Sequence, residues 1–106
     1  MIKKEYSQDQ IDISTLIKVL GHPARIAIIE HLLQVNECIC GEIVNVLPLA
    51  QPTVSQHLKE LRNAGLIKGS VEGNTICYCI DEKGIEKLAL YFNDMKTKLE
   101  QSINCC

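Results

Sequence analysis

Cysteine offers the most reactive chemistry in this sequence, because four of its six cysteines form two Cys-x-Cys pairs. The pairs are Cys38-Ile39-Cys40 and Cys77-Tyr78-Cys79, and Cys105-Cys106 closes the sequence. Two cysteines separated by one residue on an extended strand have Cα atoms near the upper limit of about 6.8 Å for a disulfide, so neither pair is expected to bridge internally. Metal binding and thiol chemistry are therefore the functions that these pairs indicate.

The redox state of these thiols depends on the compartment in which the protein works. An even number of cysteines in a short chain indicates a disulfide framework only where the surroundings are oxidising. Residues 1–6 turn polar at once and contain no apolar signal core, and no apolar run approaches the roughly 18 residues of a membrane span. We therefore expect a soluble, cytoplasmic protein with reduced thiols and no membrane partner.

Positive charge is concentrated in one short stretch of a chain that is acidic elsewhere. The formal net charge is -2, which alone does not indicate a nucleic-acid partner. Residues 51–70, however, carry three basic side chains and one acidic one, whereas residues 1–50 and 71–106 each carry four basic and six acidic ones. A dimer would present this positive stretch twice.

The hydrophobic spacing predicts a mainly helical chain with a small β-hairpin, in the order helix, helix, helix, helix, strand, strand, helix. Pro23 suits the first turn of the second helix, Asp81 suits the cap of the last one, and Glu72-Gly73-Asn74 suits the turn of the hairpin. The predicted helices cover residues 11–20, 23–34, 41–47, 51–64 and 82–103, a short extended piece covers 38–40, and the strands cover 66–67 and 75–80.

The helices within residues 41–64 and the hairpin within 66–80 together make a winged helix-turn-helix. In the second of these helices Val54, Leu58 and Leu61 share one face and are expected to pack inward. The opposite face is polar, and short polar groups and amides there are suited to base edges and phosphates in a major groove. A solvated helix face is the plainer interpretation, and His57, at the edge of the face, could equally be structural. The candidate DNA-contacting residues are Gln51, Thr53, Ser55, Gln56, His57, Lys59 and Arg62, with Asn74 on the wing.

Two segments of the chain resemble the ArsR/SmtB family of bacterial transcriptional repressors. They are residues 20–26, with the sequence LGHPARI, and residues 49–67, with the sequence LAQPTVSQHLKELRNAGLI. The resemblance extends over residues 13–80. It implies a homodimeric winged-helix protein that represses by binding double-stranded operator DNA and is released when an inducer binds. It also implies that residues 51–62 are the recognition helix and residues 72–75 the tip of the wing.

The whole chain, residues 1–106, is expected to form one domain in which residues 1–20 and 81–106 supply the dimerisation helices. The last helix repeats apolar residues every seven positions, with a second series between them, as in helices that pair along a seam. Packing against its own domain is the plainer interpretation, but the stripe continues close to the end of a small chain. The expected interface residues are Ile13, Leu16, Ile85, Leu88, Phe92, Met95 and Leu99.

Inducer sites differ among the members of this family, and neither of two known patterns fits the present sequence well. Residues 81–106 contain no histidine, so a zinc site built from Asp, His and Glu on the last helix is not expected. Another pattern places a Cys-x-Cys box for arsenite or soft metals at the start of the helix before the recognition helix. Its second cysteine would fall at Gly41, one residue beyond Cys40. We therefore expect the present pair to lie on the extended piece rather than on a helix.

This displacement predicts a cysteine cluster between strands. The short strand before a helix-turn-helix commonly pairs with the return strand of the wing, and side chains two residues apart on a strand point to the same face. Buried apolar packing is the plainer interpretation of these cysteines. Arsenite or a thiophilic metal as inducer is favoured over thiol-redox or persulfide sensing, since Glu37 and Glu42 would raise the pKa values of the neighbouring thiols and a metal displaces the protons itself. The candidate inducer ligands are Cys38, Cys40, Cys77 and Cys79, with Cys105 and Cys106 as additional ones, and no other cofactor is expected.

Functions of two other classes are less well supported. An enzyme is not expected, because the sequence has no phosphate-binding glycine loop, no carboxylates paired in an apolar setting and little room for a substrate cleft. The other class is an adaptor that uses the same fold for protein contacts. It would be favoured if replacement of Gln56 and Lys59 left the operator affinity unchanged.

Overall fold

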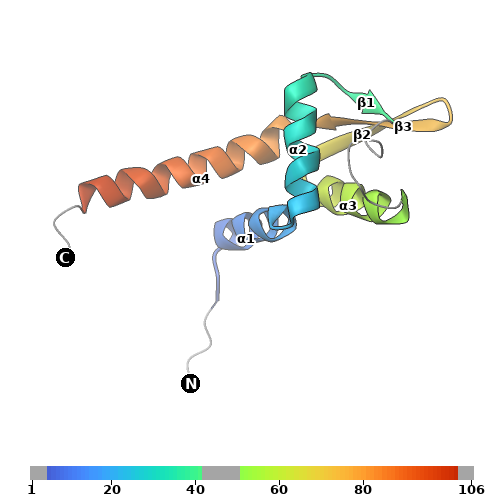
Figure 1. Cartoon of the computed structure of the whole chain (residues 1–106). Helices are drawn as coiled ribbons and strands as arrows, with labels where there is room; N and C mark the ends of the chain where they lie inside the picture. The colour runs from blue at the N-terminus through green and yellow to red at the C-terminus, as the bar shows by residue number, and fades with distance from the viewer. Residues whose placement is uncertain (1–4, 42–50, 103–106) are drawn as a thin grey trace.

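Two helices, a short strand, a third helix, a β-hairpin and a long last helix follow one another along the chain, and the strands lie together beside the second and third helices (Figure 1). The structure is a computed structural model that describes residues 5–41 and 51–102. The helix predicted over residues 41–47 falls almost entirely outside these ranges, whereas the other predicted helices and the hairpin are confirmed. The elements are α1 (Gln8–Leu20), α2 (Pro23–Val35), β1 (Ile39–Cys40), α3 (Gln51–Ala64), β2 (Ile67–Glu72), β3 (Thr75–Ile80) and α4 (Glu82–Gln101).

Local capping signals determine where the helices begin and end. α1 begins three residues earlier than predicted, because the side chains of Ser7 and Gln10 accept hydrogen bonds from each other's backbone N–H groups in a capping box. α2 ends at Asn36, which adopts a left-handed conformation with φ of 54°. α3 ends at Gly65, where a φ of 88° and two backbone hydrogen bonds onto the last turn direct the chain into β2.

Three antiparallel strands form the sheet in the order β1-β3-β2, so β3 lies in the middle. Gly73 and Asn74 make the two-residue turn between β2 and β3, and the φ of 63° at Gly73 suits a tight hairpin. β2 is longer than the strand predicted over residues 66–67. Its outer part is exposed and held by pairing with β3, so it carries no apolar alternation that the sequence could reveal. The pairing of β1 with β3 confirms the contact expected between the first strand and the return strand of the wing.

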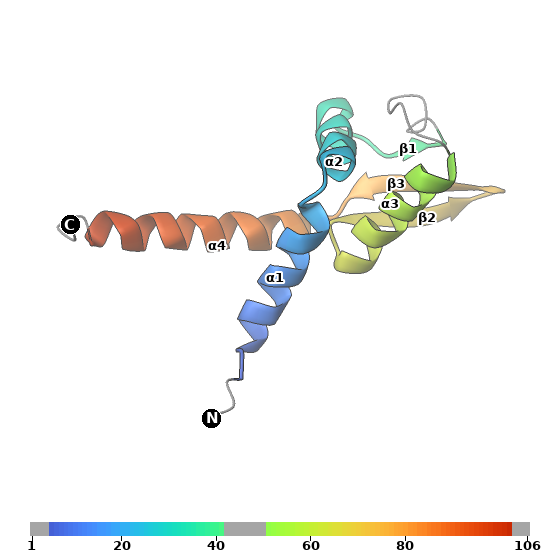
Figure 2. The same ribbon diagram turned by 60° about the horizontal axis from the view of Figure 1, so that its bottom comes forward.

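The apolar core lies between α2, α3 and the sheet, with the beginning of α4 packed against it. Ile28 and Leu32 of α2 and Leu66 before β2 are almost fully buried. The predicted inward face of α3 is confirmed, because Val54, Leu58 and Leu61 are all buried. α3 therefore lies beside the hairpin with its opposite face turned outward (Figure 2).

α4 leaves this core and extends away from it, so that its C-terminal end and the wing lie at opposite ends of the molecule (Figures 1 and 2). Asp81 caps the helix, as predicted, by accepting a hydrogen bond from the backbone N–H of Lys83. Gly84 packs so closely on the backbone after α3 that an added Cβ would overlap the carbonyl group of Gly65. Among the helices in the described ranges, none is long and apolar enough to cross a membrane.

Candidate nucleic-acid interface and cysteine site

The outward face of α3 carries most of the residues expected to contact DNA. The side chains of Thr53, Gln56, Lys59 and Arg62 are exposed there. The amide of Gln56 donates a hydrogen bond of 3.0 Å to Glu60, one turn further along the helix. This face therefore presents amide, hydroxyl and cationic groups together, which is the mixture that reads base edges and holds phosphates.

The remaining candidates on this side of the molecule lie at different places. Ser55 is an exposed residue of α3, and Asn74 is exposed at the tip of the wing. Gln51 is the first residue of α3, but its side chain lies outside the part that the structure describes. The helix and the wing tip thus form two separate candidate contacts with DNA.

His57 is not on the exposed face, which corrects its place among the DNA-contacting residues. Its exposed fraction is only 7%, and its Nδ1 accepts a hydrogen bond of 3.0 Å from Nε of Arg25 in α2. Its ring also lies 4.5 Å from the ring of His22, whose Nδ1 caps α2 by accepting from the backbone N–H of Ala24. The imidazole of His57 therefore fixes α3 to the start of α2 and supports the structural interpretation.

The electrostatic setting of His57 favours its neutral form. Burial is the main cause that lowers the pKa of His57 from its ordinary value of 6.5, and the nearby His22 and Arg25 lower it further. The hydrogen bond from Arg25 requires a neutral ring whose one proton is on Nε2, since Nδ1 must be unprotonated to accept. Because Arg25 also donates to the backbone carbonyl of Val19 at 3.1 Å, this one side chain connects α1, α2 and α3.

Arg25 and Lys68 are not among the residues predicted from the sequence. Arg25 belongs to the motif at residues 20–26 but received no role, although an arginine in the first turn of a helix after a capping histidine is a detectable signal. Lys68 contributes to the positive stretch and lies exposed on β2, at the base of the wing. Because side chains alternate along a strand and the flanking positions Ile67 and Gly69 face the core and Arg62 of α3, Lys68 lies on the opposite face of the hairpin.

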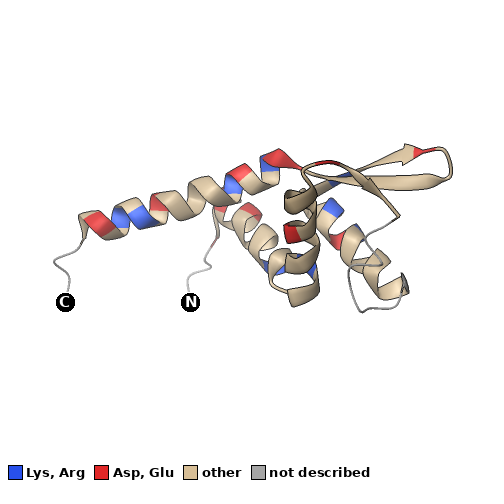
Figure 3. Ribbon diagram, turned by 45° about the horizontal axis from the view of Figure 1, so that its top comes forward, with Lys and Arg blue, Asp and Glu red and all other residues tan. Residues whose placement is uncertain are grey.

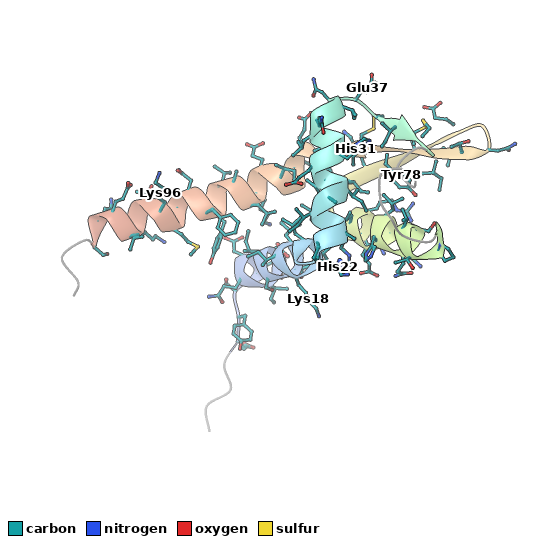
Figure 4. The ribbon with its side chains drawn as sticks, in the orientation of Figure 1. Lys18, His22, His31, Glu37, Tyr78 and Lys96 are labelled. Carbon is teal, nitrogen blue, oxygen red and sulfur yellow. A yellow bond between two sulfur atoms is a disulfide. The ribbon has the colours of Figure 1, made fainter. Side chains whose placement is uncertain are left out.

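The four cysteines of the two Cys-x-Cys pairs meet in the sheet. Cys40 lies directly opposite Cys77 in the register of β1 with β3, and Cys38 lies opposite Cys79. The Cα atoms are 4.1 Å and 4.3 Å apart, as in the closest type of antiparallel pair, where side chains approach most nearly. Each opposing pair is joined by a disulfide (Figure 4).

These two disulfides correct the expectation of reduced thiols. The reason is geometric, because opposite residues in an antiparallel pair lie within disulfide distance even though neighbours on one strand do not. Paired sulfurs are not thiolate ligands, and no three His, Cys, Asp or Glu side chains in the described ranges converge on a possible metal position. The residues in this state therefore do not fit a metal ion. Cys105 and Cys106 lie outside the described residues.

The residues expected at a dimer interface divide into two groups. Ile13, Leu16 and Leu88 are buried within the chain itself, where they join α1 and α4 to the core. Phe92 and Leu99, in contrast, have exposed fractions of 49% and 71%. Met95 is exposed with them, and Ile85 is partly buried beside the core. The apolar stripe on α4 is thus satisfied internally near its beginning and uncovered along the rest of the helix.

Comparison with known proteins relates both the sequence and the fold of this chain to bacterial regulators of the arsR family. The model of a family described as "Bacterial regulatory protein, arsR family" matches residues 22–68. The HTH-type transcriptional repressor SmtB of Mycobacterium tuberculosis is 36% identical over 75 residues, which cover 71% of this chain and 55% of that protein. The chain thus spans about half the length of this relative.

Two further known proteins match this chain over a larger share of their own length. The biofilm growth-associated repressor of Agrobacterium fabrum is 38% identical over 82 residues, or 76% of this chain and 69% of that protein. An ArsR-like transcriptional regulator from Rhodococcus sp. RHA1 superimposes with a TM-score of 0.76 at 16% identity and covers 92% of this chain and 91% of that one, which shows a shared fold. The match with the Agrobacterium protein extends the sequence similarity well beyond the helix-turn-helix.

Proposed function

Since this chain belongs to the arsR family of bacterial regulatory proteins, we propose that it is a homodimeric transcriptional repressor whose affinity for operator DNA depends on the thiol–disulfide state of β1 and β3. The family consists of DNA-binding transcriptional regulators, which agrees with the expectation that the chain is not an enzyme.

The DNA-binding part of the proposal rests on the outward face of α3. Gln56 and Thr53 carry groups that read base edges, whereas Lys59 and Arg62 carry charges that neutralise phosphates. Asn74 at the tip of the wing is exposed as well. The acidic and basic side chains alternate along α4 instead (Figure 3), so that helix offers no comparable cationic face. We therefore assign α3 to the major groove and the wing to the adjacent backbone.

The regulatory part rests on one observation, the pairwise meeting of four cysteines that lie far apart in the chain. The bridges span 41 and 37 residues and join β1, which precedes the segment leading to α3, to β3, the return strand of the wing. A bridged sheet holds the wing and the approach to α3 in one fixed relation. Reduction frees β1 to shift against β3, which lets helix and wing adjust to the DNA together. The reduced protein is therefore the form that binds the operator.

The redox step is an exchange with a small disulfide. Two protein thiols form one bridge by losing two electrons and two protons, and the small disulfide takes these up and becomes two thiols. A hydropersulfide can serve in the same way, because it transfers one sulfur to a cysteine and the opposing thiol then displaces that sulfur as hydrogen sulfide. Either oxidant would release the repressor without a metal ion.

Titration of operator DNA with the oxidised and with the reduced chain tests this proposal. Allosteric couplings of about 1–3 kcal/mol are typical, so the dissociation constant of the oxidised form is expected to be about 5- to 150-fold larger. A variant with Cys38, Cys40 and Cys79 changed to Ser and the buried Cys77 to Ala, which avoids an unpaired hydroxyl in the core, should bind like the reduced protein under both conditions.

Controls separate this mechanism from its alternatives. A variant with Cys105→Ser and Cys106→Ser should keep the full redox response. Equal operator affinity of the oxidised and reduced chains would contradict the regulatory part and leave DNA binding untouched. Release of the reduced chain by arsenite or cadmium alone, lost in the variant without the four strand cysteines, would instead support the soft-metal inducer that the sequence favoured.

A further inference from the structure

The Cys38–Cys79 bridge borders a cavity whose lining residues do not include Cys40 or Cys77. This cavity has a volume of about 250 Å³ and is lined by the end of α2, the start of α4 and the two cysteines Cys38 and Cys79. Its apolar wall is formed by Leu32, Leu33 and Ile80. A space of this size admits a molecule of a few non-hydrogen atoms directly beside one disulfide.

The two bridges also differ in how far their sulfurs are buried. Cys77 has an exposed fraction of only 3%, so one half of its bridge is inside the core. Cys38 is exposed and Cys79 is partly buried, so neither half of their bridge is enclosed. Thiol–disulfide exchange requires a thiolate to reach a bridge sulfur, and its rate therefore depends on access. Cys40 is exposed, so the Cys40–Cys77 bridge can be reached at one sulfur, whereas the bridge at the cavity is the more accessible of the two.

The charges around the cavity select among small thiols. Two carboxylates, Glu37 and Glu82, are among its lining residues, and no Lys or Arg of the described ranges is. The amide of Asn36 is the other polar group there. A small thiol that carries an ammonium group would be attracted by both carboxylates, whereas an anionic thiol would be repelled. The apolar wall accommodates the short methylene chain between the amine and the sulfur.

From this geometry we infer that the cavity is a binding site for small cationic aminothiols, which reduce the Cys38–Cys79 bridge before the Cys40–Cys77 bridge. The inference rests on the proposed redox control and names its reactant. The aminothiol thiolate attacks one bridge sulfur, and the other leaves as a thiolate. A second aminothiol then attacks the mixed disulfide, which yields two protein thiols and the disulfide of the aminothiol. Two aminothiol molecules thus supply the two electrons and two protons.

The experiment follows the reduction of the oxidised full-length chain by two thiols of equal size. These are 2-aminoethanethiol, which is cationic, and 2-mercaptoethanol, which is neutral. Samples are quenched with an alkylating reagent, and peptide mass spectrometry measures the rate at which each cysteine becomes labelled. Cys38 and Cys79 should be labelled at least about tenfold faster than Cys77 with either thiol.

The charge preference is measured by dividing the rate with the cationic thiol by the rate with the neutral thiol, and by comparing this quotient between the wild type and a variant. The comparison removes the different intrinsic reactivities of the two thiols. The rate with 2-aminoethanethiol divided by that with 2-mercaptoethanol should fall about fivefold in the variant Glu37→Gln with Glu82→Gln at low salt. The fall should shrink in 1 M salt, because the charges are then screened. Glu86→Gln with Glu100→Gln removes the same charge from exposed positions away from the cavity and should leave the ratio unchanged.

Two results would overturn the inference. Simultaneous or earlier labelling of Cys40 and Cys77 would exclude the cavity as the first point of attack. An unchanged ratio in the Glu37 and Glu82 variant would exclude recognition of the amine. Glu37→Gln alone should cause part of the fall and leaves the first turn of α4 intact, so a folding defect of the double variant cannot imitate the result. The kinetics need no operator DNA, so their failure is distinct from a failure of the proposed regulation.

Discussion

At the scale of single residues, His57 connects the chemistry of one side chain to the position of the recognition helix. Its ring is enclosed by groups from the start of α2, since Arg25 donates to it and the capping residue His22 lies against it. A proton on Nδ1 would break the hydrogen bond from Arg25 and place a second positive charge beside the guanidinium of Arg25. Protonation of His57 is therefore expected to loosen α3 from α2.

Lowering the pH should accordingly destabilise the protein through His57. The folded pKa lies below the ordinary value of 6.5, so the unfolded chain binds more protons in the interval between them. The stability contributed by neutral His57 is fully present above pH 6.5 and is lost as the pH falls through the folded pKa. Urea unfolding at a series of pH values measures this loss.

The variants His57→Asn and His31→Asn assign that loss to one residue. Asn at position 57 still offers an acceptor to Arg25 but has no proton to gain, so the dependence on pH below 6.5 should become flatter. His31 lies on α2 away from this cluster, and its replacement should preserve the wild-type dependence (Figure 4). The same slope in both variants would show that other groups cause the effect.

Lys59 provides a second test at this scale, because its side chain is expected to contact one phosphate of the DNA backbone. Lys59→Ala should weaken binding to all DNA sequences and reduce the slope of log affinity against log salt by about one. Fluorescence anisotropy of labelled operator at several salt concentrations measures this slope. Lys96→Ala removes an exposed lysine from α4 and should change neither quantity (Figure 4). An unaltered slope of log affinity against log salt for Lys59→Ala would show that this lysine does not contact a phosphate.

At the scale of elements, the direction of α4 is determined at its beginning. A single residue, Asp81, separates the end of β3 from the start of the helix. Asp81 caps the helix, and its own backbone N–H donates a hydrogen bond of 3.0 Å to the carbonyl of Leu66. The first turn then rests on the chain segment between α3 and β2, where only a glycine fits. A change in this contact should be transmitted along all 20 residues of the helix.

Gly84→Ala tests that contact. The added methyl group would collide with the backbone at Gly65, so the expected loss of unfolding free energy is about 1–3 kcal/mol, although alanine is the better helix former. Asn93→Ala, at an exposed position of the same helix, should be neutral or slightly stabilising. Chemical denaturation compares the two variants, and a Gly84→Ala protein as stable as the wild type would show that the helix can shift without cost.

At the scale of the whole molecule, the chain is more extended than a domain of its size that folds alone. Its radius of gyration is 16.9 Å and its extents are 54 × 34 × 24 Å, whereas a compact chain of about 100 residues has a radius near 13 Å. The difference comes from α4, whose outer half carries exposed Phe92, Met95 and Leu99. Large apolar side chains in such a row are expected to be covered by a second copy of the chain.

The corresponding prediction concerns mass in solution. Phe92→Asp with Leu99→Asp should convert dimers to monomers, because each places a charge in the apolar seam, and operator affinity should fall with the loss of the second recognition helix. Light scattering measures the mass. Asn93→Asp with Thr97→Asp adds the same charges beside the stripe and should remain dimeric. Dimers of the Phe92 and Leu99 variant would place the interface elsewhere.

The sequence by itself determined those features that depend on neighbours in the chain. The breaks at Asn36 and Gly65 and the cap at Asp81 require only local backbone interactions, and all three are visible in the sequence. The inward face of α3 follows from helical spacing, and the shared face of the two cysteines of each Cys-x-Cys pair follows from strand alternation. These signals were sufficient for the winged helix-turn-helix and for most of the residues exposed on the outward face of α3.

Tertiary structure decided what depends on residues far apart in the chain. The disulfides join positions 41 and 37 residues apart, and only the register of β1 with β3 sets which cysteine meets which. His57 turns inward because Arg25, 32 residues earlier, offers it a hydrogen bond. The apolar stripe of α4 is buried up to Leu88 and exposed from Phe92 onward, and this boundary likewise depends on where α4 leaves the core. A pattern of residue types shows which side chains share a face, but the partner of that face is chosen by the folded backbone.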